Sequence, residues 1–113
     1  MSRIIDRQTL VERQQSNPAL TLVEALPRKY YDDWHLPGAV HLPHDEVREK
    51  AATVLPKRDA EIVVYCASDS CRNSHIAADV LSLLGYTDVS VYAGGKADWQ
   101  EAGLPREGRS AAA

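Results

Sequence analysis

The chain has 113 residues, with 13 Lys and Arg against 16 Asp and Glu, which gives a formal net charge of −3. This length fits a single domain, and the 44% hydrophobic and 26% charged residues are close to the averages of globular proteins. The acidic balance, without a basic stripe, argues against nucleic-acid binding, and no apolar run approaches the roughly 18 residues of a membrane span. Charged residues stand within Met1–Asp6, so we expect no signal peptide and a cytoplasmic location.

Strands and helices alternate along the predicted chain. The first half is predicted to hold a helix from the N-cap Asp6 to the residue before Asn17, a strand over 19–25, a helical turn that carries Tyr30, Tyr31 and Trp34, and a strand over 39–42. The second half is predicted to hold a helix over 45–53, a strand over 61–65, a helix with apolar residues from Ile76 to Leu84, a strand over 89–92 and a last helix that contains Trp99. This order predicts an α/β fold with a largely parallel sheet.

Two segments stand out for opposite reasons. The β-branched run Ile62–Val64 predicts a strand that is buried on both faces, as in a parallel sheet. Residues 106–113 offer little to bury, and we expect them to be a disordered or vector-derived tail. The domain itself is therefore expected to cover residues 1–105.

The two cysteines, Cys66 and Cys71, are separated by four residues. A secreted scaffold held by disulfides would contain more cysteines, so two close thiols favour catalysis, metal binding or redox sensing. Zinc binding by Cys66, Cys71 and His75 would need a distant histidine as the fourth ligand, so we predict no metal site. Cys71 itself fits three roles: a resolving thiol, a small residue that fills the loop, or a minor substrate contact.

Cys66 directly follows the most buried predicted strand, and reactive crevices of parallel sheets lie beyond the carboxyl ends of the strands. The segment from Ala67 to Ser74 contains no proline, so every residue keeps an N–H that can bind an anion. A helix begins after this loop, and the N-terminus of a helix stabilises a thiolate. Arg72 adds a fixed positive charge. The loop is therefore predicted to activate Cys66 as a nucleophile.

Several short motifs, in order and at the right spacing, resemble the rhodanese-like (sulfurtransferase) domain family. They are Leu22–Glu24, His35–Pro43, Val63–Cys66, Leu84–Tyr86, Tyr92–Gly95, Trp99 and Gly103–Pro105. The resemblance extends from about Leu20 to Pro105. It implies a single domain with a five-stranded, mostly parallel sheet flanked by helices on both faces.

The resemblance also implies a function and a site. Cys66 would accept sulfane sulfur as a persulfide and pass it to a thiol or cyanide, with no cofactor. The substrate-binding loop would comprise Ala67, Ser68, Asp69, Ser70, Cys71 and Arg72. The implied partners are a small sulfur donor or a protein persulfide, and a thiol or cyanide acceptor, without nucleic acid or membrane; no oligomeric state is implied.

Two alternative functions stay open at this point. The spacing Cys66-x5-Arg72 is that of phosphatase and arsenate-reductase loops, which bind a tetrahedral oxyanion, although Tyr65 stands where those enzymes usually have His. Asp69 within the loop would repel a dianion. The other alternative is a non-catalytic or redox-sensing module in which Cys66 and Cys71 form a disulfide. That pairing requires Cα atoms within about 7 Å of each other.

Overall fold

The computed structural model describes residues 3–110, in which five strands form one sheet in the order β1-β5-β4-β2-β3. The strands are β1 (Arg3–Ile5), β2 (Thr21–Glu24), β3 (Val40–His41), β4 (Ile62–Tyr65) and β5 (Val89–Tyr92). The helices are α1 (Arg7–Ser16), α2 (Arg28–Asp33), α3 (Val47–Val54), α4 (Asn73–Leu83) and α5 (Gly95–Glu101). All neighbouring strands pair in parallel, so the predicted α/β class and parallel sheet are confirmed.

The ends of the helices follow from local chemistry. The carboxylate of Asp6 accepts a hydrogen bond from the amide of Thr9 at 2.8 Å, which is the predicted N-cap of α1. The chain leaves α4 through Gly85, whose φ of 95° lies in the left-handed region that favours glycine. Among the helices described, none is long and apolar enough to cross a membrane.

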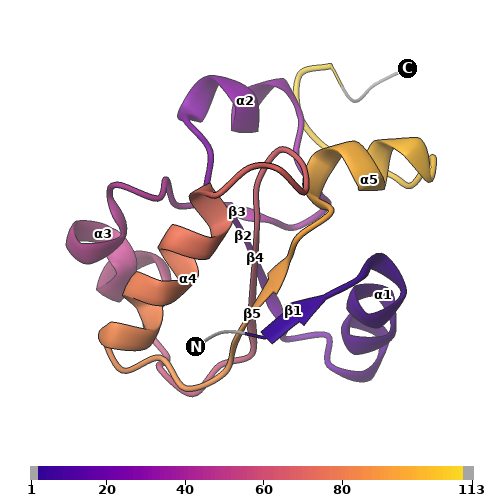
Figure 1. The fold of residues 1–113 in the computed structure, drawn as a ribbon. Helices are drawn as coiled ribbons and strands as arrows, with labels where there is room; N and C mark the ends of the chain where they lie inside the picture. Colours follow the sequence, from indigo (N-terminus) through magenta and orange to yellow (C-terminus); the bar gives the residue numbers. More distant parts are fainter. Residues whose placement is uncertain (1–2, 111–113) are drawn as a thin grey trace.

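Helices cover both faces of the sheet, with α3 and α4 on one side and α1 and α5 on the other (Figure 1). Strand β4 lies at the centre of the sheet, and its four residues are fully buried. Ile62 and Val64 pack toward α3 and α4, whereas Val63 and Tyr65 pack toward α1 and α5. The prediction of a strand buried on both faces is confirmed. The chain therefore leaves the protein interior only at the two ends of β4.

Two terminal segments differ from the expectations. Strand β1 does not follow from the sequence pattern, yet Arg3–Ile5 pairs with β5 at the edge of the sheet. Residues 106–110, expected to be part of a tail without structure, lie against the segment from Asp32 to His35. Glu107 and His35 exchange two backbone hydrogen bonds of 2.7 and 2.9 Å, and the guanidinium of Arg106 lies over the ring of Trp34. Residues 111–113 of that segment lie outside the described residues.

Candidate active site

Cys66 is the first residue after β4 and is only 1% exposed. The chain continues through residues 67–72 and enters α4 at Asn73. Cys66 thus lies at the carboxyl end of the central strand and beside the N-terminus of an 11-residue helix. A helix N-terminus favours a stabilised thiolate, and the carboxyl ends of parallel strands are where the ligand crevices of such sheets lie.

The loop after Cys66 keeps most of its amides free. The amide of Cys71 donates to the carbonyl of Ser68 at 3.0 Å, which closes a tight turn. Within residues 3–110, the amides of residues 67–70 donate to no protein acceptor. Ala67, Asp69 and Ser70 are exposed. These amides therefore remain available to an anion.

The sulfur of Cys66 faces the first turn of α4. It lies 3.3 Å from the hydroxyl oxygen of Ser74 and 3.5 Å from the carbonyl oxygen of Cys71. Ser74 is almost completely buried, so its hydroxyl has few partners other than this sulfur. In the reduced protein, a hydroxyl that donates to the Cys66 thiolate, together with the helix dipole, would favour the charged form of this side chain. The sequence does not single out Ser74 for this contact.

Cys66 and Cys71 form a disulfide, with their Cα atoms 6.4 Å apart. This separation lies within the range found for disulfides and below the 7 Å limit that the redox hypothesis requires. The turn between Ser68 and Cys71 returns the chain toward the end of β4, which explains how thiols so close in sequence meet. The Cys66 loop described here is therefore its oxidised form.

The backbone at the start of α5 is hydrogen-bonded to the first residues of the Cys66 loop. The amides of Lys96 and Ala97 donate to the carbonyls of Cys66 and Ala67 at 3.0 and 2.8 Å. Gly95 makes this approach possible, because a Cβ at this position would clash with the carbonyl oxygen of Cys66. Its φ of 61° also lies in the left-handed region. The sequence predicts a turn at Gly94–Gly95, but it does not predict the close approach of Gly95 to the backbone of Cys66.

A buried ion pair lies behind the loop. The ammonium of Lys96 is 3.2 Å from the Glu24 carboxylate, and the side chains of these two residues are 9% and 0% exposed. Lys96 also donates to the carbonyl of Tyr30 at 2.8 Å and lies 4.8 Å from the centre of the Trp34 ring. The hydroxyl of Tyr65, next to Cys66, donates to Glu24 at 2.9 Å. The residue before Cys66 is thus hydrogen-bonded to the buried ion pair.

Burial dominates the electrostatics of this group. It raises the pKa of Glu24 and lowers the pKa of Lys96, while the attraction between their charges opposes both shifts. Burial, followed by the charge of Glu24, also raises the pKa of Tyr65, so its phenol stays protonated and remains a donor. The sequence alone does not predict this pair. The sequence does offer one indication of such a pair: Glu24 stands in an apolar strand, and a buried carboxylate is rarely left without a cation.

The other predicted residues have simpler surroundings. Arg72 precedes α4 and is exposed, and within the described chain its guanidinium has no ion-pair partner. His35 stacks on Tyr31, and its Nδ1 lies 2.8 Å from the Tyr31 carbonyl. The Nε2 of His41 lies 2.6 Å from the carbonyl of Leu26. Both histidines therefore contact the backbone. Among residues 3–110, no three His, Cys, Asp or Glu side chains gather as metal ligands.

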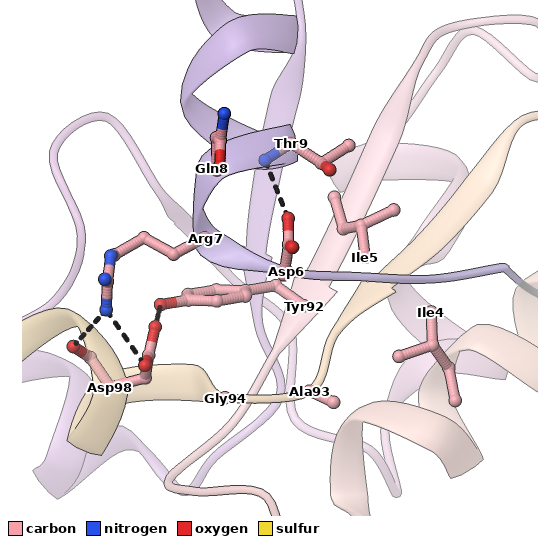
Figure 2. A pocket seen from close by; sticks show the side chains of 10 residues that line it. All are labelled: Ile4, Ile5, Asp6, Arg7, Gln8, Thr9, Tyr92, Ala93, Gly94 and Asp98. Carbon is pink, nitrogen blue, oxygen red and sulfur yellow. Dashed lines mark hydrogen bonds and ion pairs between the residues drawn. The ribbon is translucent and has the colours of Figure 1, made fainter.

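A cavity of about 730 Å³ lies apart from the Cys66 loop, at the start of α1 and the end of β5 (Figure 2). Of the charged groups that line it, Arg7 and Asp98 pair with each other, and Asp6 caps α1. Figure 2 shows Arg7 and Tyr92 both directed at Asp98, with Arg7 at 3.0 Å from the carboxylate. These contacts join α1 to α5, and no residue from 66 to 72 lines the cavity.

The arrangement of the sheet and the cysteine loop has counterparts in known proteins. A family model for the Rhodanese-like domain matches residues 6–102 of this chain. The chain belongs to the rhodanese-like domain family. The resemblance inferred from the sequence motifs is confirmed, and the match covers every strand of the rhodanese-like domain except β1.

Relatives of this rhodanese-like domain include an enzyme and a regulator. The thiosulfate sulfurtransferase PspE of Escherichia coli is 38% identical over 73 residues, which cover 65% of this chain and 66% of PspE. An HTH-type transcriptional regulator of Mycobacterium tuberculosis is 32% identical over 101 residues, which cover 89% of this chain and 43% of the regulator. The chain thus spans about two-thirds and less than half of the lengths of these relatives.

The fold agrees with a solved structure of the same kind. The solution structure of a rhodanese-like domain from Anabaena sp. superposes with a TM-score of 0.85 at 30% identity, covering 99% of this chain and 83% of that chain. The predicted rhodanese-like fold, with a five-stranded parallel sheet between helices, is therefore confirmed.

Proposed function

We propose that this rhodanese-like domain is a sulfurtransferase that carries sulfane sulfur as a persulfide on Cys66. The observation that supports this most directly is the placement of Cys66 between the end of β4 and the N-terminus of α4, under a loop with free amides. The relative PspE, named a thiosulfate sulfurtransferase, supports the same activity. The proposal concerns the reduced form of the loop, in which the Cys66 sulfur is free.

In the first half-reaction, the Cys66 thiolate attacks the outer sulfur of thiosulfate or of a persulfide. The S–S bond of the donor breaks, and sulfite or a thiolate leaves with the bonding electrons. The new persulfide anion lies at the helix N-terminus, where the amides of residues 67–70 can bind its charge. Arg72 adds attraction for an anionic donor from the exposed side of the loop.

In the second half-reaction, a thiolate or cyanide attacks the outer sulfur of the Cys66 persulfide. The product is a new persulfide or thiocyanate, and Cys66 leaves as a thiolate. Stabilisation of this thiolate by α4 and Ser74 makes Cys66 a good leaving group as well as a nucleophile. No step of this cycle requires a cofactor.

The test is to incubate reduced protein with thiosulfate, and separately with inorganic polysulfide, and to record intact and peptide masses. We expect the gain of one sulfur on the Cys66 peptide and its removal by cyanide as thiocyanate. The variant Cys66→Ser should gain nothing. A matched control combines Cys66→Ser with Ser16→Cys, which places a thiol at an exposed helix end, and it should also stay unloaded. Equal loading of this control would overturn the proposal.

A further inference from the structure

The disulfide between Cys66 and Cys71 points to a second activity of the loop. We propose that Cys71 is an internal acceptor: it attacks the Cys66 persulfide and releases the sulfane sulfur as hydrosulfide. This inference rests on the proposed function, because it requires that Cys66 first becomes a persulfide. It adds a product, hydrosulfide, and a partner class, a dithiol reductant, to sulfur transfer between external molecules.

The geometry brings the sulfur of Cys71 to one atom, the Sγ of Cys66. The two residues already form a disulfide at a Cα separation of 6.4 Å, and the turn closed by the Ser68 carbonyl and the Cys71 amide holds Cys71 in place. In the Cys66 persulfide, this Sγ is the inner sulfur. Attack by Cys71 therefore occurs at the inner sulfur, whereas external acceptors attack the outer one. Because both thiols belong to one short loop, the reaction is intramolecular and has a high effective concentration.

The chemistry balances without another reactant. The Cys71 thiolate forms a bond to the Cys66 Sγ, and the bond between this Sγ and the outer sulfur breaks. The outer sulfur leaves with the electron pair as hydrosulfide, taking a proton from solvent. The sulfane sulfur is reduced by two electrons, and the two thiols are oxidised to the disulfide that the structure shows.

The two cysteines differ in exposure in the way that reduction of their disulfide by a dithiol requires. Cys66 is 1% exposed, whereas Cys71 is only partly buried. An incoming dithiol therefore reaches the Cys71 sulfur first, and Cys66 becomes the leaving thiolate. The helix N-terminus and the Ser74 hydroxyl stabilise that thiolate, so the exchange favours this direction. A second exchange frees Cys71 and oxidises the dithiol, which supplies the two electrons.

The experiment is a single turnover without any external thiol. Protein is reduced, freed of reductant and kept anaerobic, and one equivalent of thiosulfate is added. An organic thiosulfonate serves as a second donor, because attack on its sulfane sulfur also gives the Cys66 persulfide and releases a sulfinate. Released sulfide and the mass of the protein are measured together. We expect about one equivalent of sulfide per chain and loss of two hydrogens with a Cys66–Cys71 bridge.

Variants at Cys71 test whether its thiol causes the release of sulfide. Cys71→Ser and Cys71→Ala should hold the persulfide on Cys66 and release at least about tenfold less sulfide, because no intramolecular thiol is left. Cys71→Ser combined with Ser16→Cys keeps the number of thiols but moves one to an exposed helix end, and it should also release little. Two Cys71 variants are used so that a folding defect in one of them does not decide the result.

The outcomes separate this inference from the proposed function. If wild-type protein loads Cys66 but keeps the persulfide, and Cys71 still reacts with an alkylating reagent, the proposed role of Cys71 is wrong. The proposed sulfurtransferase function is then still supported. The same holds if Cys71→Ser releases as much sulfide as wild type. If no donor loads Cys66 in any form of the protein, both proposals are wrong.

Discussion

Lys96 and Cys66 are linked directly by a backbone hydrogen bond and indirectly by buried side-chain contacts. The amide of Lys96 donates to the carbonyl of Cys66 at 3.0 Å, and its ammonium pairs with Glu24, which accepts from Tyr65 next to Cys66. Lys96 supplies a cation for the buried carboxylate, and the backbone of the same residue positions the start of the Cys66 loop.

Replacement of Lys96 by methionine should destabilise the protein by about 3–5 kcal/mol near neutral pH, because Glu24 remains buried without a cation. The free energy of unfolding from urea denaturation measures this loss. Glu24→Gln combined with Lys96→Met removes both charges and should recover most of it. Lys50→Met is the matched control, because the Lys50–Glu46 pair is exposed, and its stability should not change. A Lys96→Met variant as stable as Lys50→Met would contradict the role of the buried pair.

The pH dependence of the Lys96→Met variant has a definite sign. Burial already raises the pKa of Glu24, and loss of Lys96 removes the attraction that opposes this shift. An acid whose folded pKa lies above its unfolded value contributes stability at low pH, and this contribution is lost as the pH rises through the folded pKa. The deficit relative to wild type should therefore be smaller near about pH 5 than near about pH 8. A deficit that grows on acidification would contradict the buried, unpaired carboxylate.

Gly95→Ala should damage both the fold and the site. The left-handed φ alone costs roughly 1–2 kcal/mol for a residue with a Cβ, and here the Cβ would also clash with the Cys66 carbonyl oxygen. Gly103 is a matched control, since it has a similar φ of 71° but open space around it. Gly103→Ala should show only the backbone cost, measured by thermal unfolding, and load sulfur at the wild-type rate. Gly95→Ala should unfold at a lower temperature than Gly103→Ala and load sulfur more slowly.

The phenol of Tyr65 links two buried polar groups, and Tyr65→Phe tests this link. The hydroxyl donates to Glu24 at 2.9 Å and accepts from the amide of Leu36 at 3.1 Å. Its removal leaves a buried amide without a partner, which costs about 1–3 kcal/mol. Urea denaturation should show this loss, and Tyr30→Phe, at an exposed tyrosine, should not. Equal stability of the two variants would mean that the hydroxyl contributes nothing.

Local signals predicted most of the fold, and contacts between distant residues explain what they missed. The cap of α1 at Asp6, the buried strand β4 and the position of Cys66 all follow from neighbouring residues. Strand β1 has three residues, too few for a periodic pattern, and it depends on pairing with β5. Glu24 and Lys96 are 72 positions apart, so no local pattern relates them. Residues 106–110 are held mainly through backbone bonds, which composition does not reveal.

Two charges in the loop should have opposite effects on anionic donors. Arg72 and Asp69 are both exposed, so each contributes a screened interaction with thiosulfate. Arg72→Ala should raise the KM for thiosulfate about two- to fivefold, and Asp69→Asn should lower it by a similar factor. Alkylation of Cys66 by iodoacetamide, an uncharged reagent, is the control reaction, and its rate should respond much less to either change. Both effects should shrink at high salt, because screening shortens the range of each charge. Equal changes for thiosulfate and for iodoacetamide would show that the variants alter the loop itself, not its electrostatic attraction for the donor.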